Sequence, residues 1–114
     1  MKKIILLSMI FVCFLMSCED MPFTENKYKY EVTGTSGSYS VTIENADNNT
    51  QQFSSVGNGW YYSWTQTGTR WLYLSAQNNN GTGNVTVNIY KNDKKIATNT
   101  SYGGYTIATV DGTY

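Results

Sequence analysis

The chain has 114 residues, with eight basic and eight acidic side chains and a formal net charge of zero. It contains no histidine and only two cysteines, Cys13 and Cys18, which excludes Ser-His-Asp triads, Cys-His nucleophiles and four-ligand zinc sites. No basic stripe is present, so the sequence does not support a nucleic-acid partner, and we expect neither a cofactor nor a metal.

The N-terminus has the pattern of a bacterial export signal. Lys2 and Lys3 precede an apolar run over residues 4–16, which is too short to span a bilayer as a stable helix. The run ends in Leu-Met-Ser-Cys, which resembles a lipobox and implies cleavage before Cys18 and acylation of its thiol and amine. An ordinary secretory signal or a weak membrane anchor are the alternatives. We therefore expect a signal peptide over residues 1–17 and a lipid-anchored protein of the cell envelope, on a membrane and a face that stay open.

Residues 18–27 are expected to form a tether. They contain the only proline, Pro22, and show no hydrophobic periodicity. A flexible coil of this length spans roughly 15–20 Å, so the domain would stay near the membrane. Glu19 and Asp20 directly follow the cysteine, an arrangement similar to that of surface lipoproteins of Bacteroidota; a plain solvated linker explains them equally well.

Residues 28–114 read as one β domain. Val, Thr, Tyr and Trp dominate, Gly and Asn cluster between the runs, and no segment has a sustained helical period. The expected strands are residues 28–34, 38–44, 50–56, 60–65, 69–77, 85–89, 96–100 and 105–110, with a tight hairpin turn at Asn92-Asp93. Seven or eight short strands favour an all-β antiparallel sandwich resembling the immunoglobulin class, with a closed small barrel as the alternative.

Two-residue alternation assigns faces to these strands. Tyr28, Tyr30 and Val32 point one way, and Leu72, Leu74 and Ala76 do the same further along the chain. In residues 69–77 the opposite face also holds large rings, which indicates either cover on both sides or an exposed aromatic pair. The Asn-rich stretch over residues 78–83 lacks the carboxylates that a calcium site needs, so we expect a solvated turn there.

Aromatic residues form the one feature that resembles a binding site. The candidates are Trp60, Tyr61, Trp64, Trp71 and Tyr73. Exposed rings stack on sugar faces and supply interface hot spots, whereas core filling is the alternative for most of them. Alternation allows Trp60 and Trp64, together with Tyr62, to be the buried set.

Four segments resemble the MmpS family of small mycobacterial membrane proteins. They are YEVTGT (30–35), LSAQN (74–78), GNVTVNIYKNDKKIA (83–97) and TSYGGYTIATV (100–110). The resemblance implies an immunoglobulin-like sandwich and partnership with a resistance-nodulation-division exporter of the MmpL type. Members usually carry a transmembrane helix, where this chain has a lipobox. Members also have cysteines where Val87 and Val110 stand, which implies that these two positions lie on neighbouring antiparallel strands and face the core.

The sequence thus predicts a non-catalytic, membrane-tethered envelope lipoprotein that acts as an accessory or interaction subunit beside an envelope transporter or another envelope protein. The acidic residues lie mostly in turns or alternate outward, so a catalytic carboxylate pair is not expected. The alternative is a surface lipoprotein that binds glycan or peptide through exposed aromatic rings.

Overall fold

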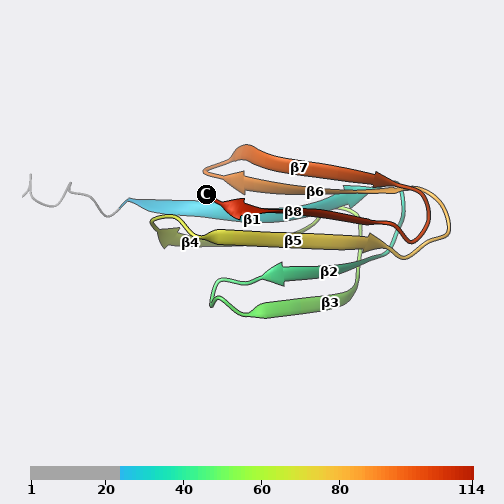
Figure 1. The fold of residues 1–114 in the computed structure, drawn as a ribbon, viewed down its shortest axis with the longest axis horizontal. Coiled ribbons are helices and arrows are strands. Elements are labelled where there is room, and N and C mark those ends of the chain that lie inside the picture. The colour runs from blue at the N-terminus through green and yellow to red at the C-terminus, as the bar shows by residue number, and fades with distance from the viewer. Residues whose placement is uncertain (1–23) are drawn as a thin grey trace, which may run out of the picture.

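The structure, a computed structural model, describes residues 24–114. The predicted signal peptide, Cys18 and most of the predicted tether lie outside the described residues. The described part consists of strands and connecting turns (Figure 1). The strands are β1 (Glu25–Gly34), β2 (Tyr39–Glu44), β3 (Thr50–Val56), β4 (Trp60–Thr67), β5 (Trp71–Asn78), β6 (Asn84–Lys91), β7 (Lys94–Tyr102) and β8 (Ile107–Thr113).

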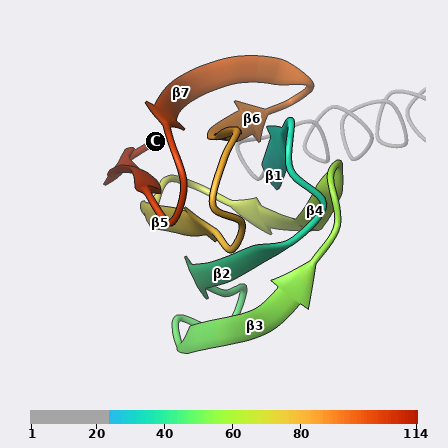
Figure 2. The same ribbon diagram turned by 90° about the vertical axis from the view of Figure 1, so that its right-hand side faces the viewer.

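The eight strands form two antiparallel four-stranded sheets. Their orders are β4-β1-β6-β7 and β3-β2-β5-β8. Only β2–β3 and β6–β7 are hairpins within one sheet, because every other connection passes to the opposite sheet. Seen along the strands, β7 and β3 lie on opposite sides of the molecule (Figure 2). The predicted all-β sandwich is confirmed, and the closed barrel is not what forms.

The core is filled by one alternate set of residues from each central strand. The buried side chains of β1 are Tyr28, Tyr30 and Val32, and those of β5 include Leu72, Leu74 and Ala76, as the alternation predicts. The other fully or almost fully buried apolar side chains are Tyr39, Val41, Ile43, Val85, Val87, Ile89 and Ala108. Burying this apolar surface is the main stabilising term in a domain whose described residues contain no cysteine.

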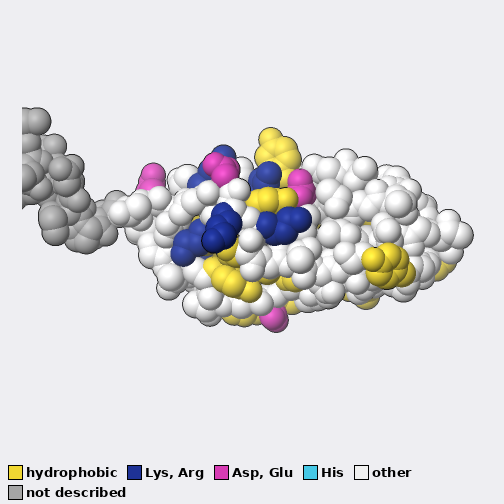
Figure 3. Space-filling model, turned by 90° about the horizontal axis from the view of Figure 1, so that it is seen from above, with side chains coloured by type: hydrophobic (Ala, Val, Ile, Leu, Met, Phe, Trp, Pro, Cys, Tyr) yellow, Lys and Arg dark blue, Asp and Glu magenta, His cyan; other side chains and the backbone are white. Residues whose placement is uncertain are grey.

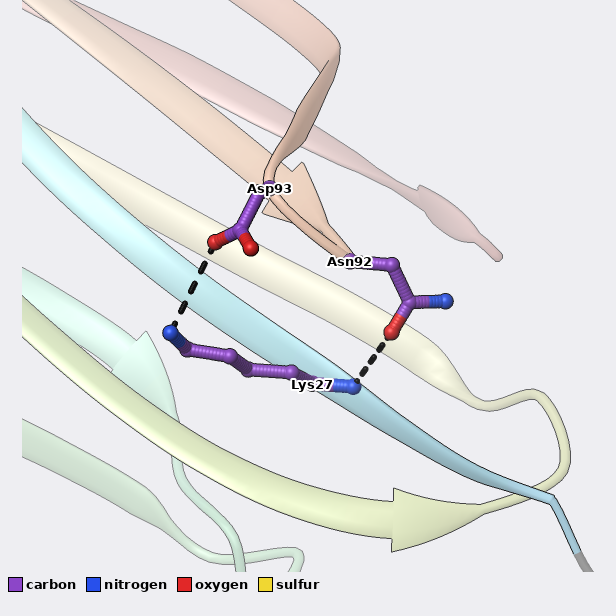
Figure 4. A network of polar contacts seen from close by, with 3 residues as sticks. All are labelled: Lys27, Asn92 and Asp93. Carbon is purple, nitrogen blue, oxygen red and sulfur yellow. Dashed lines mark hydrogen bonds and ion pairs between the residues drawn. The ribbon is translucent and has the colours of Figure 1, made fainter.

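β1 begins at Glu25, before the predicted start at Tyr28, and the turn between β6 and β7 contacts this extension. Asn92 and Asp93 have φ values of 53° and 67°, the left-handed pair that a tight hairpin turn requires. Asn92 Oδ1 accepts a hydrogen bond from the Lys27 N–H at 2.9 Å (Figure 4), and the Asn92 N–H donates to the Lys27 carbonyl at 2.7 Å. The Lys27 ammonium lies 3.5 Å from the Asp93 carboxylate. Residues 25–27, which the sequence had assigned to the tether, pair with residues 65–67 of β4, and the contacts with the turn add to this pairing.

The expectation that Val87 and Val110 lie on neighbouring antiparallel strands is wrong. Val87 lies in β6 and pairs with Val32 of β1 and Asn99 of β7, whereas Val110 lies in β8 and pairs with Leu74. The two valines therefore belong to opposite sheets, because the chain leaves β7 at a sheet edge and crosses before β8 joins β5. The predicted face of Val110 is correct, since it packs against the buried core.

One side of the sandwich is closed by side chains that bridge β7 and β8. Asn99 Nδ2 donates to the Thr109 carbonyl at 3.0 Å, and Ser101 Oγ donates to the Ile107 carbonyl at 2.6 Å. These bonds satisfy carbonyl groups that would otherwise point away from the edge of a sheet. The two sheets are thereby joined along this side.

The charged residues of the described chain lie towards one end of the sandwich. They fall in residues 25–31, 44–47, 91–95 and at Arg70 and Asp111. The antiparallel register brings these segments towards the end where β1 begins and β6 ends, with Glu31 nearer the middle of the strands, opposite Asn88. Figure 3 shows this segregation on one face, where basic and acidic side chains gather towards that end and the opposite end displays none. The opposite end is therefore an uncharged surface made of loops rich in Gly, Ser, Asn and Tyr.

Candidate functional site

The five predicted aromatic residues divide between three environments. Trp60 and Trp64 point into the sandwich from β4 and pack against the core. Tyr61 points out from the same strand with 63% of its surface exposed. Trp71 and Tyr73 lie on the outer face of the other sheet, on β5. The structure therefore does not gather all five into one site.

Trp60 and Trp64 are held in the interior by other rings. The Trp64 ring lies 5.0 Å from Tyr30 and 5.5 Å from Tyr28, measured between ring centroids. Trp60 lies 4.9 Å from Phe53 of β3. Contacts of this kind contribute about 0.5–1.5 kcal/mol each beyond the area they bury. Trp60 thus connects the two sheets, whereas Trp64 packs on rings of β1 in its own sheet, and both tryptophans are removed from the candidate binding surface.

Tyr61 stands on the outer face of the β1-containing sheet beside a cation. The Lys29 ammonium lies 4.6 Å from the centre of the Tyr90 ring and 5.8 Å from that of Tyr61. Glu31 accepts a hydrogen bond from the Tyr90 hydroxyl at 3.0 Å. Burial, together with this bond to a carboxylate, raises the pKa of Tyr90. Tyr61 is therefore exposed as a single ring next to a charged network, without a second free ring beside it.

Trp71 and Tyr73 form the exposed aromatic pair that the sequence left as one of two alternatives. Their ring centroids are 5.6 Å apart and their planes are inclined by 27°, which is an offset stack. Trp71 has 48% of its surface exposed, and Tyr73 is half-buried. The pair is adjacent in one strand because residues two apart on a β-strand point to the same face. One face of each ring is taken by the other ring, and the remaining surface is available to a ligand.

Hydrogen-bonding side chains surround the pair. On β8, Thr113 lies opposite Trp71, and Asp111 lies opposite Tyr73. Next along the strand, Ser75 accepts a hydrogen bond from the Thr109 hydroxyl at 3.1 Å. The outward positions of this sheet contain Glu44 and Asp111 and no Lys or Arg. The surface thus combines two rings with hydroxyls and carboxylates, and its charge is negative.

A shallow depression of about 460 Å³ lies on the same sheet, across β2 and β3. Hydroxyl and amide side chains line it together with the apolar Val41 and Phe53; the polar lining residues are Ser40, Thr42, Gln52 and Ser54. Thr42 pairs with Ser75 of β5, so the depression begins one strand away from the aromatic pair. The rings and the depression therefore form one continuous polar and aromatic surface.

Tyr30 fixes the backbone beneath the pair. Its hydroxyl crosses from β1 to the other sheet, donates to the Glu44 carbonyl at 2.8 Å and accepts the Tyr73 N–H at 3.3 Å. Burial raises the pKa of Tyr30 to about 12, so the hydroxyl stays protonated and able to donate at neutral pH. This buried side chain sets the spacing of β2 and β5 where Tyr73 emerges.

Arg70 anchors the turn that precedes Trp71. Its guanidinium donates to the carbonyls of Asn45 and Ala46 at 2.7 and 3.3 Å, and to Gln66 Oε1 at 3.0 Å. The guanidinium carbon also lies 5.4 Å from the centre of the Trp64 ring. Arg70 is thus engaged in holding two turns together, which leaves the negative surface around Trp71 without a competing cation.

Sequence reasoning missed a second exposed group, in the connection from β7 to β8. Tyr102, Tyr105 and Ile107 have 77%, 64% and 56% of their surfaces exposed. The predicted strand start at Tyr105 is wrong, because Tyr105 has a φ of 60° and lies in a turn before β8. The pair of glycines at 103 and 104 was the available signal that the turn extends this far.

Asn78 holds this connection in place. The sequence assigned it to a solvated turn, but it ends β5 and is fully buried. Its amide donates to the carbonyls of Thr82 and Gly103 at 2.9 and 3.1 Å, and its Oδ1 accepts the Asn80 N–H at 3.0 Å.

The residues that the structure describes contain no group of three or more His, Cys, Asp or Glu side chains placed to hold a metal ion.

No protein-family model matches the chain, and no curated protein is significantly similar to it. Across residues 24–114, no helix has the length and apolar character needed to cross a membrane. Cys18, the predicted acylation site, lies outside the described residues.

Proposed function

We propose that this chain is a non-catalytic, lipid-anchored binding module of the cell envelope, held on its membrane through Cys18, and that it binds a neutral glycan on the Trp71–Tyr73 pair. The observation that carries the proposal is the outward-facing, offset-stacked pair with carboxylate and hydroxyl side chains around it. The C–H face of a pyranose packs on an exposed ring, while its hydroxyls need acceptors and donors nearby. Exposed rings and hydrogen-bonding side chains are both present on this face of the sheet.

The charge of the surface selects the class of glycan. Glu44 and Asp111 accept hydrogen bonds from sugar hydroxyls but repel carboxylated or sulfated sugars. No outward Lys or Arg on this sheet offsets that repulsion. Each ring–sugar contact contributes on the order of 1 kcal/mol, by analogy with aromatic pairs. The module should therefore bind neutral glycans weakly and anionic ones more weakly still.

A panel of neutral and acidic oligosaccharides tests the proposal. The wild-type protein should bind neutral members, and Trp71→Ala should lose most of that binding. Tyr61→Ala is the matched control, because it removes an exposed ring from the opposite face. Binding that is confined to acidic glycans, or that is equally reduced by Trp71→Ala and Tyr61→Ala, would contradict the proposal.

The second candidate function is an accessory subunit that contacts an envelope protein, such as an exporter of the MmpL type. The observation that favours it is the uncharged end of the sandwich with its exposed Tyr102, Tyr105 and Ile107. Large apolar side chains that are exposed close together in the chain, on an uncharged surface, are typical of protein contact sites. Purification of the acylated protein from solubilised membranes should recover an exporter subunit with the wild type but not with Tyr102→Ser/Ile107→Ser. Recovery that is the same with both proteins would count against this candidate.

Anchoring is a separate claim with its own test. Cys18→Ser should leave an uncleaved or soluble precursor and abolish incorporation of labelled fatty acid. Normal processing together with an unchanged membrane fraction would show that Cys18 is not the anchor.

A further inference from the structure

Four strands lie at the edges of the two sheets: β4 and β7 in one sheet, and β3 and β8 in the other. An edge strand presents unpaired N–H and C=O groups that can pair with another chain. Proteins therefore protect their edges with charged residues, proline, β-bulges or covering groups. The four edges of this sandwich differ sharply in such protection.

Three of the edges are protected. β7 begins with Lys94 and Lys95, and its pairing with β6 has a register shift. β8 has two carbonyls bonded by side chains of β7 and also carries Asp111. β3 pairs with β2 through a register shift, which marks a β-bulge.

β4 has none of these devices. Its eight residues pair with β1 in an unbroken register from Glu25–Thr67 to Val32–Trp60. The strand contains no charged residue and no proline. Within residues 24–114, no side chain hydrogen-bonds to its backbone, and its one backbone bond outside the ladder runs from the Trp60 N–H to the Gly57 carbonyl. β4 is thus a long, regular and open edge.

We propose that β4 pairs antiparallel with β4 of a second copy of this chain, which joins two four-stranded sheets into one. The free backbone groups call for an extended strand as the occupant. The inner side of β4 carries Trp60, Tyr62 and Trp64, which are half-buried at the margin of the core. A strand that continues the sheet must therefore be apolar on that side and polar on the other, with a period of two, and β4 itself has this pattern.

The outer side of β4 also suits pairing with itself. Its residues, Tyr61, Ser63, Thr65 and Thr67, carry no charge. Two-fold antiparallel pairing of identical strands places like side chains near one another, which is destabilising for charged residues and acceptable for these. Such an interface is isologous and closes at two copies.

Disulfide trapping in native membranes tests the pairing with the full, acylated chain. Tyr61→Cys, Ser63→Cys and Thr65→Cys are introduced singly and are also co-expressed in pairs, because side chains directly opposite in an antiparallel pair lie within reach of a disulfide and a residue faces its own copy only on the two-fold axis. At least one of these combinations should give a disulfide-linked dimer. Lys94→Cys and Thr113→Cys are matched controls on the protected edges and should give several-fold less.

A charge variant supplies the second arm. Lysine at the facing positions that form the disulfide places like charges directly opposite each other and should abolish co-purification of two differently tagged copies, and glutamate at the same positions should do the same. Co-expression of the lysine and glutamate variants should restore co-purification of the differently tagged copies. No disulfide-linked dimer with any of the cysteine combinations, cross-linking to a different protein, or co-purification unaffected by the lysine variant would each overturn the proposal. The result is independent of glycan binding, since Trp71 and Tyr73 lie on the other sheet.

Discussion

Tyr30→Phe tests whether a single buried hydroxyl fixes the two sheets beneath the aromatic pair. The substitution keeps the ring, which is fully buried and stacks near Tyr62 and Trp64. It removes the hydrogen bond to the Glu44 carbonyl and the one accepted from the Tyr73 N–H. A buried backbone group left without a partner costs about 1–3 kcal/mol. Because Glu44 and Tyr73 are only half-buried, water can partly replace the hydroxyl, and we expect a loss at the lower end of that range.

The expected loss of about 1–2 kcal/mol at neutral pH corresponds to a fall in Tm of roughly 5–15 °C for a domain of this size. Urea unfolding followed by fluorescence measures it, with an unchanged m-value as evidence that the fold is retained. Tyr61→Phe is the control, since no hydrogen bond of its hydroxyl is found among the described residues, and it should lie within about 0.5 kcal/mol of the wild type.

The pH dependence gives the same variant a second readout. Burial raises the pKa of Tyr30 from its ordinary value of 10.0 to about 12 in the folded protein. The contribution of protonated Tyr30 to the free energy of unfolding is therefore fully present below pH 10. It is lost as the pH rises from 10 to 12, by about 2–3 kcal/mol in total. Tyr30→Phe should decline less steeply than the wild type over this range. Equal stability at neutral pH, or the same decline in both proteins, would refute the reasoning.

Three further substitutions test other parts of the structure. Asn78→Ala should lower the free energy of unfolding by about 2–3 kcal/mol, because two carbonyls lose a buried donor; Asn80→Ala, with an exposed side chain, should change it little in the same urea titration. Asp93→Gly should increase the free energy of unfolding by up to about 1 kcal/mol and so raise the Tm slightly, since glycine adopts the positive φ of the hairpin turn without strain. A lower Tm would show that the ion pair between Asp93 and Lys27 of β1 contributes more to stability than the relief of this strain. Leu74→Ala should cost about 2–5 kcal/mol as a core cavity, whereas Ser75→Ala on the outer face should be nearly neutral in thermal unfolding.

Local patterns in the sequence were sufficient to predict a β-sandwich and the inward faces of its strands. Alternation identified the inward residues of β1 and β5, since a period of two leaves each strand with a single choice of face. The Asn92-Asp93 turn was recognisable because few residues tolerate two successive positive φ values. Information of this kind is contained within a few neighbouring residues.

Contacts between distant segments were not predictable in the same way. Residues 25–27 join β1 because they pair with residues 65–67 of β4 and because the side chain of Asn92, 65 residues from Lys27, accepts a hydrogen bond from the Lys27 N–H. Tyr105 stays out of β8 because its N–H bonds to the Asn80 carbonyl and its own carbonyl accepts Gln77 Nε2. Such pairings depend on sheet order, which alternation alone does not specify.

The candidate site was predicted in part for the same reason. Alternation separated Trp60 and Trp64 from Tyr61, and Trp71 and Tyr73 from their buried neighbours. Alternation did not determine which of the two sets of aromatic residues on a strand would face solvent, since that depends on which side of the strand the opposite sheet covers. The exposed rings of the β7–β8 connection were missed because a strand was expected where the chain turns.

Fluorine NMR of protein labelled with 5-fluorotryptophan tests the central claim most directly. The chain contains three tryptophans, which are assigned by single Trp→Phe variants. Titration with the neutral glycan that binds best should shift the resonance of Trp71 and leave those of Trp60 and Trp64 nearly unchanged, because only Trp71 lies on the exposed pair. Saturable shifts confined to Trp60 or Trp64, or no shift at concentrations where binding is detected, would contradict the assignment of the Trp71–Tyr73 surface as the binding site.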